Sequence, residues 1–171
     1  NALRNFWIEL GVTQKDISVP LATLFSHNTK MIDDDAPRLS FVRNPIAVHL
    51  DGDIPEHVTL PLHPNHPNKG VRTILMNPST VHIESNDASG LYRLKEFADV
   101  EANGILGSIE RSDKRPIIHW VSESTSKEAT LIIPDQEEMQ RITGRVESNN
   151  HPIGTIVQLE RIGYAIITKD G

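Results

Sequence analysis

The residues in this sequence with the clearest chemical potential are histidines in and before one short stretch. Leu60–Arg72 reads LPLHPNHPNKGVR, in which His63 and His66 lie three positions apart, and His49 and His57 precede it. A zinc site needs three or four ligands that converge on one point. Both histidines of the stretch precede a proline, which favours extended backbone for them, and no further ligand follows at a usual spacing. We therefore expect turn or surface histidines and no metal site.

The same stretch contains two basic residues that suit phosphate. Lys69 could bind it as a point charge and Arg72 as a bidentate fork. The stretch has one glycine and no helical pattern after it, so it is neither a Walker loop nor a dinucleotide fingerprint. A solvated turn is the simpler interpretation. With no cysteine and no Gly-x-Ser-x-Gly elbow elsewhere, the sequence shows no catalytic centre.

Composition restricts the class of protein further. The chain has 171 residues, 37% of them hydrophobic and 23% charged, with a formal net charge of −6. An acidic excess disfavours a general nucleic-acid binder, although it does not describe local fields. No apolar run reaches the ~18–20 residues that span a bilayer, and no signal-peptide pattern occurs. We therefore expect a cytoplasmic protein without a membrane partner.

The pattern that must position these residues changes once along the chain. Apolar residues recur at helical spacing in Ala2–Leu10, Gly11 is a suitable C-terminal cap, and Ser18 is an N-cap candidate for a second helix that reaches Met31. From Arg38 onward, short segments such as AVHLDG and TVHIES alternate apolar and polar residues between turns. The sequence predicts a helical lead-in followed by a mainly β body of one or two barrels.

Two aromatic residues lie in strand-like runs of this body. Trp120 occurs in IIHWVS and Tyr164 in RIGYAII. Core packing is the simpler interpretation of both. Stacking on an unpaired base is the alternative, because bases splayed from an RNA loop are commonly held on aromatic planes.

Five segments, taken together and in order, carry a family resemblance. They are APRLSFVRNPIAVHLDG (36–52), LPLHPNHPNKGVR (60–72), TVHIESNDA (80–88), IIHWVS (117–122) and VQLERIGYAIITKDG (157–171). They resemble the anticodon-binding region of glutaminyl- and archaeal-type glutamyl-tRNA synthetases. The segment between IIHWVS and the final strands is short, and in this respect the chain resembles the shorter archaeal-type glutamyl enzymes. We therefore favour a glutamyl over a glutaminyl enzyme.

The resemblance implies a fold and a parent activity. It implies two six-stranded antiparallel β-barrels, with a helical connector at 1–35, a proximal barrel at 36–88 plus 156–171, and a distal barrel at 89–155. The family's ATP signatures are missing, so the chain would lack the catalytic domain, hold no cofactor and be inactive alone. The parent would be a glutamate-tRNA ligase that uses ATP and Mg²⁺. Its partners would be tRNA(Glu), tRNA(Gln) if it is non-discriminating, and its own catalytic domain, but not DNA.

The resemblance also assigns readers of the central anticodon base, which is uridine in glutamate and glutamine tRNAs. The pairing edge of uridine runs acceptor, donor, acceptor. A glutamine amide offers one acceptor and two donors, and arginine adds a fork of donors. Arg38 of the APR motif and Gln158 of VQLER match the family's central-base readers. The simpler interpretation of Gln158 is an outward-facing strand residue.

The other two bases are matched less completely. In YRLKEF, Arg93 and Lys95 stand at the family's first-base positions and would project from one face of a strand. The third-base reader has no counterpart, because Ser85–Gly90 lacks an arginine. This gap favours an enzyme that charges both tRNAs. We expect Lys69 and Arg72 to contact the tRNA backbone, and a β-barrel protein-interaction module is the alternative function.

Overall fold

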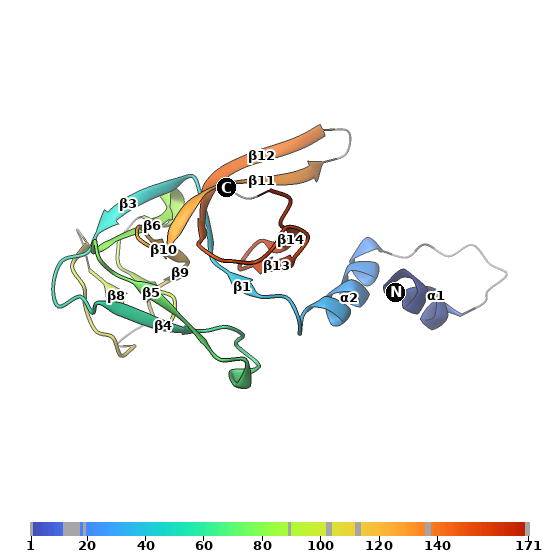
Figure 1. Ribbon diagram of the computed structural model, residues 1–171, viewed down its shortest axis with the longest axis horizontal. Coiled ribbons are helices and arrows are strands. Elements are labelled where there is room, and N and C mark those ends of the chain that lie inside the picture. The colour runs from blue at the N-terminus through green and yellow to red at the C-terminus, as the bar shows by residue number, and fades with distance from the viewer. Residues whose placement is uncertain are drawn as a thin grey trace. The chain divides into compact units, whose positions relative to one another are not determined.

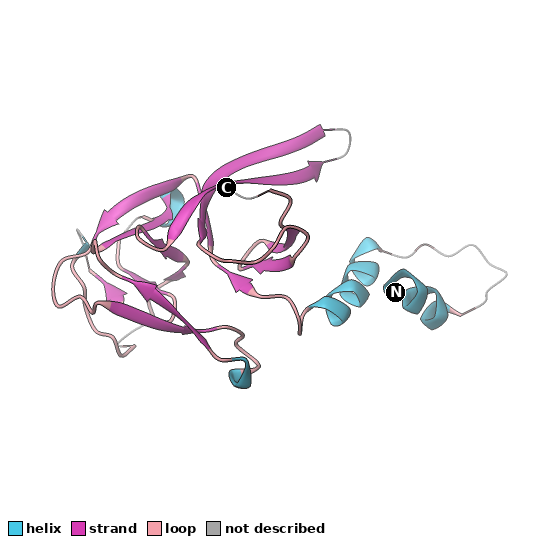
Figure 2. Ribbon diagram, in the orientation of Figure 1, coloured by secondary structure: helices cyan, strands magenta, loops and turns pink. Residues whose placement is uncertain are grey.

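The computed structural model describes residues 2–11, 18, 20–88, 90–101, 104–111, 114–135 and 138–169. The fold is mainly β with two short helices (Figure 2). The chain consists of two compact units, Asn1–Pro37 and Arg38–Gly171. Among the described residues, no helix is long and apolar enough to cross a membrane.

The first unit contains the two expected helices, α1 (Ala2–Leu10) and α2 (Leu21–Ile32). α1 ends at Gly11, whose φ of +70° is the left-handed conformation that suits a glycine cap. The predicted N-cap at Ser18 is wrong. Pro20 precedes α2, in extended backbone and without a side-chain cap, so the helix begins where proline has fixed φ.

The described part of the second unit contains fourteen strands and two 3-10 turns (Figure 1). The first strands are β1 (Arg38–Leu39), β2 (Phe41–Arg43), β3 (Pro45–His49), β4 (His57–Pro61), β5 (Val71–Leu75), β6 (Thr80–Glu84) and β7 (Tyr92–Leu94). The remaining strands are β8 (Asp99–Val100), β9 (Ile117–Ile118), β10 (Trp120–Ser122), β11 (Ser126–Asp135), β12 (Glu138–Glu147), β13 (Ile156–Leu159) and β14 (Gly163–Ile166). The turns are η1 (Pro67–Lys69) and η2 (Ser85–Asp87).

These strands form small sheets in the orders β1-β13-β14, β10-β6-β3, β11-β12-β2, β4-β5 and β8-β7-β9. Most pairs are antiparallel, but β1–β13 and β7–β9 are parallel, so the expectation of purely antiparallel sheets is wrong. Parallel neighbours need a long connection, and nearly the whole unit lies between β1 and β13. The two six-stranded barrels stay a prediction.

Two hydrophobic cores lie inside this unit. The first joins residues from Leu50 to Trp120 and includes Val58, Ile83 and Leu94. The second joins strands β1, β2 and β13 to the long hairpin formed by β11 and β12. Its members are Leu39, Phe41, Val157 and Leu159, with Leu131 and Val146 packed against them. The expected distal unit 89–155 is therefore shared between the cores: β7–β10 belong to the first, and β11 and β12 contribute to the second.

The hairpin is held against the start of the unit by a close backbone contact. β12 pairs with β2, and Gly144 lies opposite Arg43. A Cβ atom at Gly144 would clash with the carbonyl of Val42 and lie 2.6 Å from the ring of Phe41. Only glycine permits this approach, which places β2 and its neighbour β1 beside the second core.

Candidate nucleic-acid interface

Three polar residues lie in a row across the sheet β1-β13-β14. Arg38 is the register partner of Gln158, and Gln158 is the partner of Tyr164 on its other side. Directly opposed residues share a face of a sheet. The neighbours Leu39 and Leu159 alternate to the other face and enter the second core. The sheet thus brings both predicted central-base readers together, although they are 120 positions apart in the chain.

The guanidinium at the start of this row has a buried partner. Arg38 is 4% exposed and His63 is 2% exposed. Arg38 Nη2 lies 2.9 Å from His63 Nε2. His63 therefore lies in the turn, as expected, but its side chain is buried inside the protein and not on the surface. Gln158, which is half-buried, is the more accessible of the two readers.

The turn that carries His63 is fixed by an ion pair. Arg72 Nε lies 2.6 Å from Glu147 Oε1, and Arg72 Nη1 donates to the carbonyl of Pro61 at 2.6 Å. The other carboxylate oxygen of Glu147 accepts the backbone N–H of Ser40 at 3.2 Å. Burial raises the pKa of Glu147, although Arg72 opposes that shift. Arg72, proposed from sequence as a backbone contact, is engaged inside the protein.

Arg93, the first-base candidate on β7, also has internal partners. Its Nη1 lies 2.7 Å from Asp99 Oδ1, and Asp99 is fully buried. Arg93 Nη2 donates to the carbonyl of Ile109 at 2.6 Å. Arg115 approaches the same carboxylate at 3.8 Å and binds Glu101 at 3.0 Å. These contacts join β7 to the segment that follows β8.

Lys95, the second first-base candidate, belongs to an ion-pair cluster that joins the segments after β7 and β9 to Glu160, which follows β13. Its Nζ is 2.5 Å from Glu160 Oε1, and His119 Nδ1 is 3.1 Å from Glu160 Oε2. Burial raises the pKa of Glu160, but the contacts with His119 and Lys95 outweigh it and lower the pKa to about 2. The Glu160 carboxylate therefore stays charged and offsets the positive charge of Lys95.

The remaining predicted residue differs from these. Lys69 ends the turn η1, is exposed, and has no ion pair recorded among the described residues. Arg161, in the turn after β13, places its Nη1 2.8 Å from Asp87. Asp87 belongs to the segment Ser85–Gly90, which has no arginine to read the third base. Within the described ranges, no group of three or more histidine, cysteine or acidic residues could hold a metal ion.

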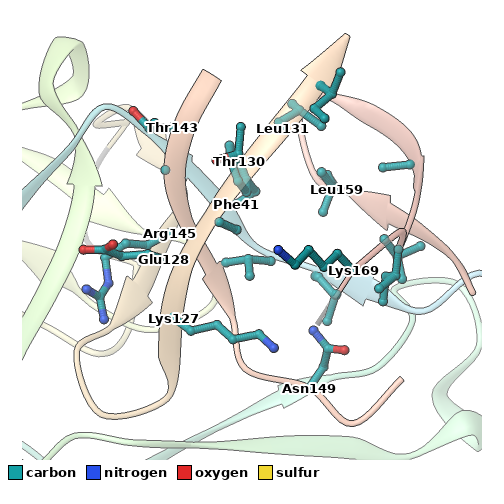
Figure 3. Close-up of a pocket in the computed structure, with 18 of the residues that line it drawn as sticks. Phe41, Lys127, Glu128, Thr130, Leu131, Thr143, Arg145, Asn149, Leu159 and Lys169 are labelled. Carbon is teal, nitrogen blue, oxygen red and sulfur yellow. The ribbon is translucent and has the colours of Figure 1, made fainter. Parts of the chain in front are cut away.

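A cavity lies on the other side of the row. It measures about 1090 Å³ and runs between the β11–β12 hairpin and the strands β13 and β14 (Figure 3). Phe41, Leu131 and Leu159 form part of its apolar lining, and Lys127 and Lys169 stand at it. Because Leu159 faces this cavity, the adjacent Gln158 faces away from it, so the cavity is separate from the row.

Sequence reasoning missed the contacts of two residues of this region. His63 was expected in a turn, and only the fold shows that it meets Arg38. Glu160 follows the VQL motif directly, but its partners Lys95 and His119 come from distant segments. Trp120, by contrast, packs in the first core as expected, and its indole N–H donates to the carbonyl of Lys95 at 3.1 Å.

Comparison with known proteins agrees with these observations. The family profile described as the anti-codon binding domain of class I tRNA synthetases (E and Q) matches residues 36–117, and a second profile with the same description matches 117–168. A glutamate-tRNA ligase of Pyrococcus furiosus is 33% identical over 186 positions, covering 98% of this chain and 32% of that protein.

Other relatives have the same name. A glutamate-tRNA ligase of Pyrococcus abyssi is 32% identical and covers 98% of this chain and 32% of its own length. One from Archaeoglobus fulgidus is 32% identical and covers 95% of this chain and 30% of its own length. The chain thus spans about a third of the length of the curated relatives it matches.

Proposed function

Because the chain belongs to the anticodon-binding domain family of the class I glutamyl- and glutaminyl-tRNA synthetases, we propose that it binds the anticodon of tRNA(Glu) through the row Arg38–Gln158–Tyr164. The observation that carries this proposal is the register of β1, β13 and β14, which puts a guanidinium, an amide and a phenol side by side on one face. Arg38 and Gln158 are the two residues that match the family's readers of the central base, and they are direct partners in this register.

The chemistry of this row suits a uridine edge. The amide oxygen of Gln158 would accept the N3–H of the base, and its NH₂ would donate to one carbonyl. Arg38, behind it in the row, would donate to the other carbonyl. Tyr164 would flank the base with its ring, since stacking is the usual way to hold an unpaired base. A cytidine has a donor where uridine has the O4 acceptor, so it would oppose these donors.

The first and third bases would be read less strictly. Arg93 and Lys95 project where the family reads the first base, but both are ion-paired, so we propose that they shape this surface more than they select a base. Ser85–Gly90 offers no arginine for the third base. This favours an enzyme that accepts tRNA(Gln) as well as tRNA(Glu). The exposed Lys69 would contact the tRNA backbone.

The whole protein would be a glutamate-tRNA ligase of the cytoplasm that uses ATP and Mg²⁺, by likeness to its relatives. Trp7 and Phe25 on the helical unit are 59% and 63% exposed. An apolar face of this kind suits packing against a catalytic domain. We further propose that the two cores mark two barrels, one around residues 45–122 and one around 38–43 with 126–167.

Binding of a tRNA(Glu) transcript tests this function directly. Fluorescence anisotropy titrations at 50 and 200 mM salt would measure Kd for the transcript and for a protein ligand control. The proposal predicts that tRNA affinity falls steeply with salt, because phosphate contacts release counterions. The alternative, a protein-interaction module favoured by the net charge of −6, predicts no tRNA binding at either salt concentration.

A further inference from the structure

The turn between β4 and β5 has a buried histidine that the base-reading chemistry leaves without a role. We propose that His63 is a positioning residue, which holds the Arg38 guanidinium in place for its contact with the central anticodon base. This inference rests on the proposed function and deepens it. It gives LPLHPNHPNKGVR a part in recognition that needs neither a metal nor a phosphate.

A hydrogen bond between these two side chains can run in one direction only. A guanidinium carries N–H donors and no acceptor, so at 2.9 Å the Nε2 atom of His63 must accept from Arg38 Nη2. His63 is 2% exposed and Arg38 is 4% exposed. At this burial water does not compete for the bond, and hydrogen bonds from charged donors are the stronger kind.

The second ring nitrogen supplies an alternative role that can be tested. The backbone N–H of Asn65 lies 3.1 Å from His63 Nδ1. A neutral imidazole has one acceptor nitrogen, so it can accept either from Asn65, which would make His63 a turn residue, or from Arg38. The charged donor favours the bond to Arg38.

The backbone around His63 keeps this distance constant. Leu62 N–H donates to the carbonyl of Gly70 at 3.0 Å and closes the base of the turn. Glu147 then ties the hairpin to the first strand, because it binds Arg72 at 2.6 Å and accepts the N–H of Ser40 at 3.2 Å. Ser40 lies two residues after Arg38. Histidine and arginine are therefore fixed to the same frame.

Such a frame matters because arginine has a long side chain. An unrestrained guanidinium would lose rotamer freedom when the base binds, and that loss would subtract from affinity. A guanidinium that is already held loses less. The effect is specific to Arg38, so it disappears when Arg38 is absent.

Three substitutions of His63 separate the roles. His63→Gln places an amide oxygen near the position of Nε2 and keeps an acceptor for Arg38, whereas His63→Asn places it near Nδ1 and keeps only the acceptor for Asn65. His63→Leu removes both. His57→Ala, at an exposed position on the same hairpin, is the matched control. Each variant would be made alone and with Arg38→Ala, and urea unfolding would accompany every Kd.

We expect His63→Leu and His63→Asn to raise the Kd for tRNA(Glu) about tenfold, which corresponds to about 1.4 kcal/mol of binding free energy. His63→Gln and His57→Ala should stay within about twofold. In the Arg38→Ala background, none of the His63 changes should weaken binding further. Equal losses for Gln and Asn, additive losses with Arg38→Ala, or tight binding by His63→Asn would each overturn the inference. If Arg38→Ala alone binds as tightly as the wild type, the proposed function has failed at Arg38 instead.

Discussion

Strands β1 and β7 each contain an arginine that the family pattern makes a base reader, and the two guanidinium groups make different contacts. Arg38 meets the neutral ring atom His63 Nε2 and stands beside the amide of Gln158. Arg93 meets the buried carboxylate of Asp99. The contact with a neutral acceptor does not offset a positive charge, whereas the contact with a carboxylate does.

The difference indicates how a charged strand residue acquires a role. Both arginines lie on short strands at positions that match the family's readers, so the sequence pattern does not distinguish a reader from a structural cation. The partner does. Where the partner is a carboxylate, as for Arg93 and Lys95, removal of the cation should destabilise the fold, and where it is neutral, removal should affect RNA binding instead.

The largest expected effect is on the fold. Arg93→Ala takes from the fully buried Asp99 its cation at 2.7 Å, and Arg115 lies farther away at 3.8 Å. We expect the free energy of unfolding in urea to fall by about 3 kcal/mol, the lower end of the range for breaking a buried ion pair. Arg161→Ala, which breaks an exposed pair with Asp87, should cost under about 1 kcal/mol. An unchanged urea midpoint for Arg93→Ala would erase the contrast with Arg38.

The next effect concerns the carboxylate beside Lys95. The pKa of Glu160 is lowered to about 2, below the ordinary value of an unfolded chain. Its contribution to stability is therefore present above the unfolded pKa and lost as the pH falls towards the folded one. Between pH 5 and pH 3 the loss should be about 2 kcal/mol.

Urea unfolding of the wild type and of Glu160→Gln across this pH range measures that contribution. The difference between the two proteins should shrink as the solution becomes more acidic. Parallel curves would mean that Lys95 and His119 do not stabilise the charged carboxylate, and Lys95 would again be available as a first-base reader.

A smaller effect is expected on the reading row. Gln158→Ala should weaken tRNA(Glu) binding by about 1–2 kcal/mol, because it removes the acceptor for N3–H and one donor, and it should leave the urea midpoint unchanged. Tyr164→Phe keeps the ring on the same face and serves as the control. A loss of stability without a loss of affinity would make Gln158 an ordinary strand residue.

The smallest effect belongs to the exposed turn. Lys69→Ala should weaken tRNA binding a few-fold at 100 mM salt and reduce the slope of log affinity against log salt by about one, as expected for a single phosphate contact. The loss should be equal for transcripts with different anticodons. A loss confined to one anticodon would make Lys69 a base reader.

How much of this was predictable from sequence depends on the distance over which residues interact. Helical spacing gave α1 and α2, and alternation gave strands around Val81 and Val157, because both patterns are local. The contacts of Arg38 with His63 and of Glu160 with Lys95 and His119 were not predictable, because these partners lie far away in the chain. Parallel pairing of β1 with β13 was missed for the same reason.

The contrast between Arg38 on β1 and Arg93 on β7 depends on whether Arg38 reads the central anticodon base. The decisive measurement is the Kd of the wild type and of Arg38→Ala for tRNA(Glu) transcripts with uridine or cytidine at the central anticodon position. We predict at least tenfold tighter binding to the uridine transcript, in the range of about 1–3 kcal/mol for a good base contact, and a ratio close to one for Arg38→Ala. A wild-type ratio of one would contradict central-base reading by this row.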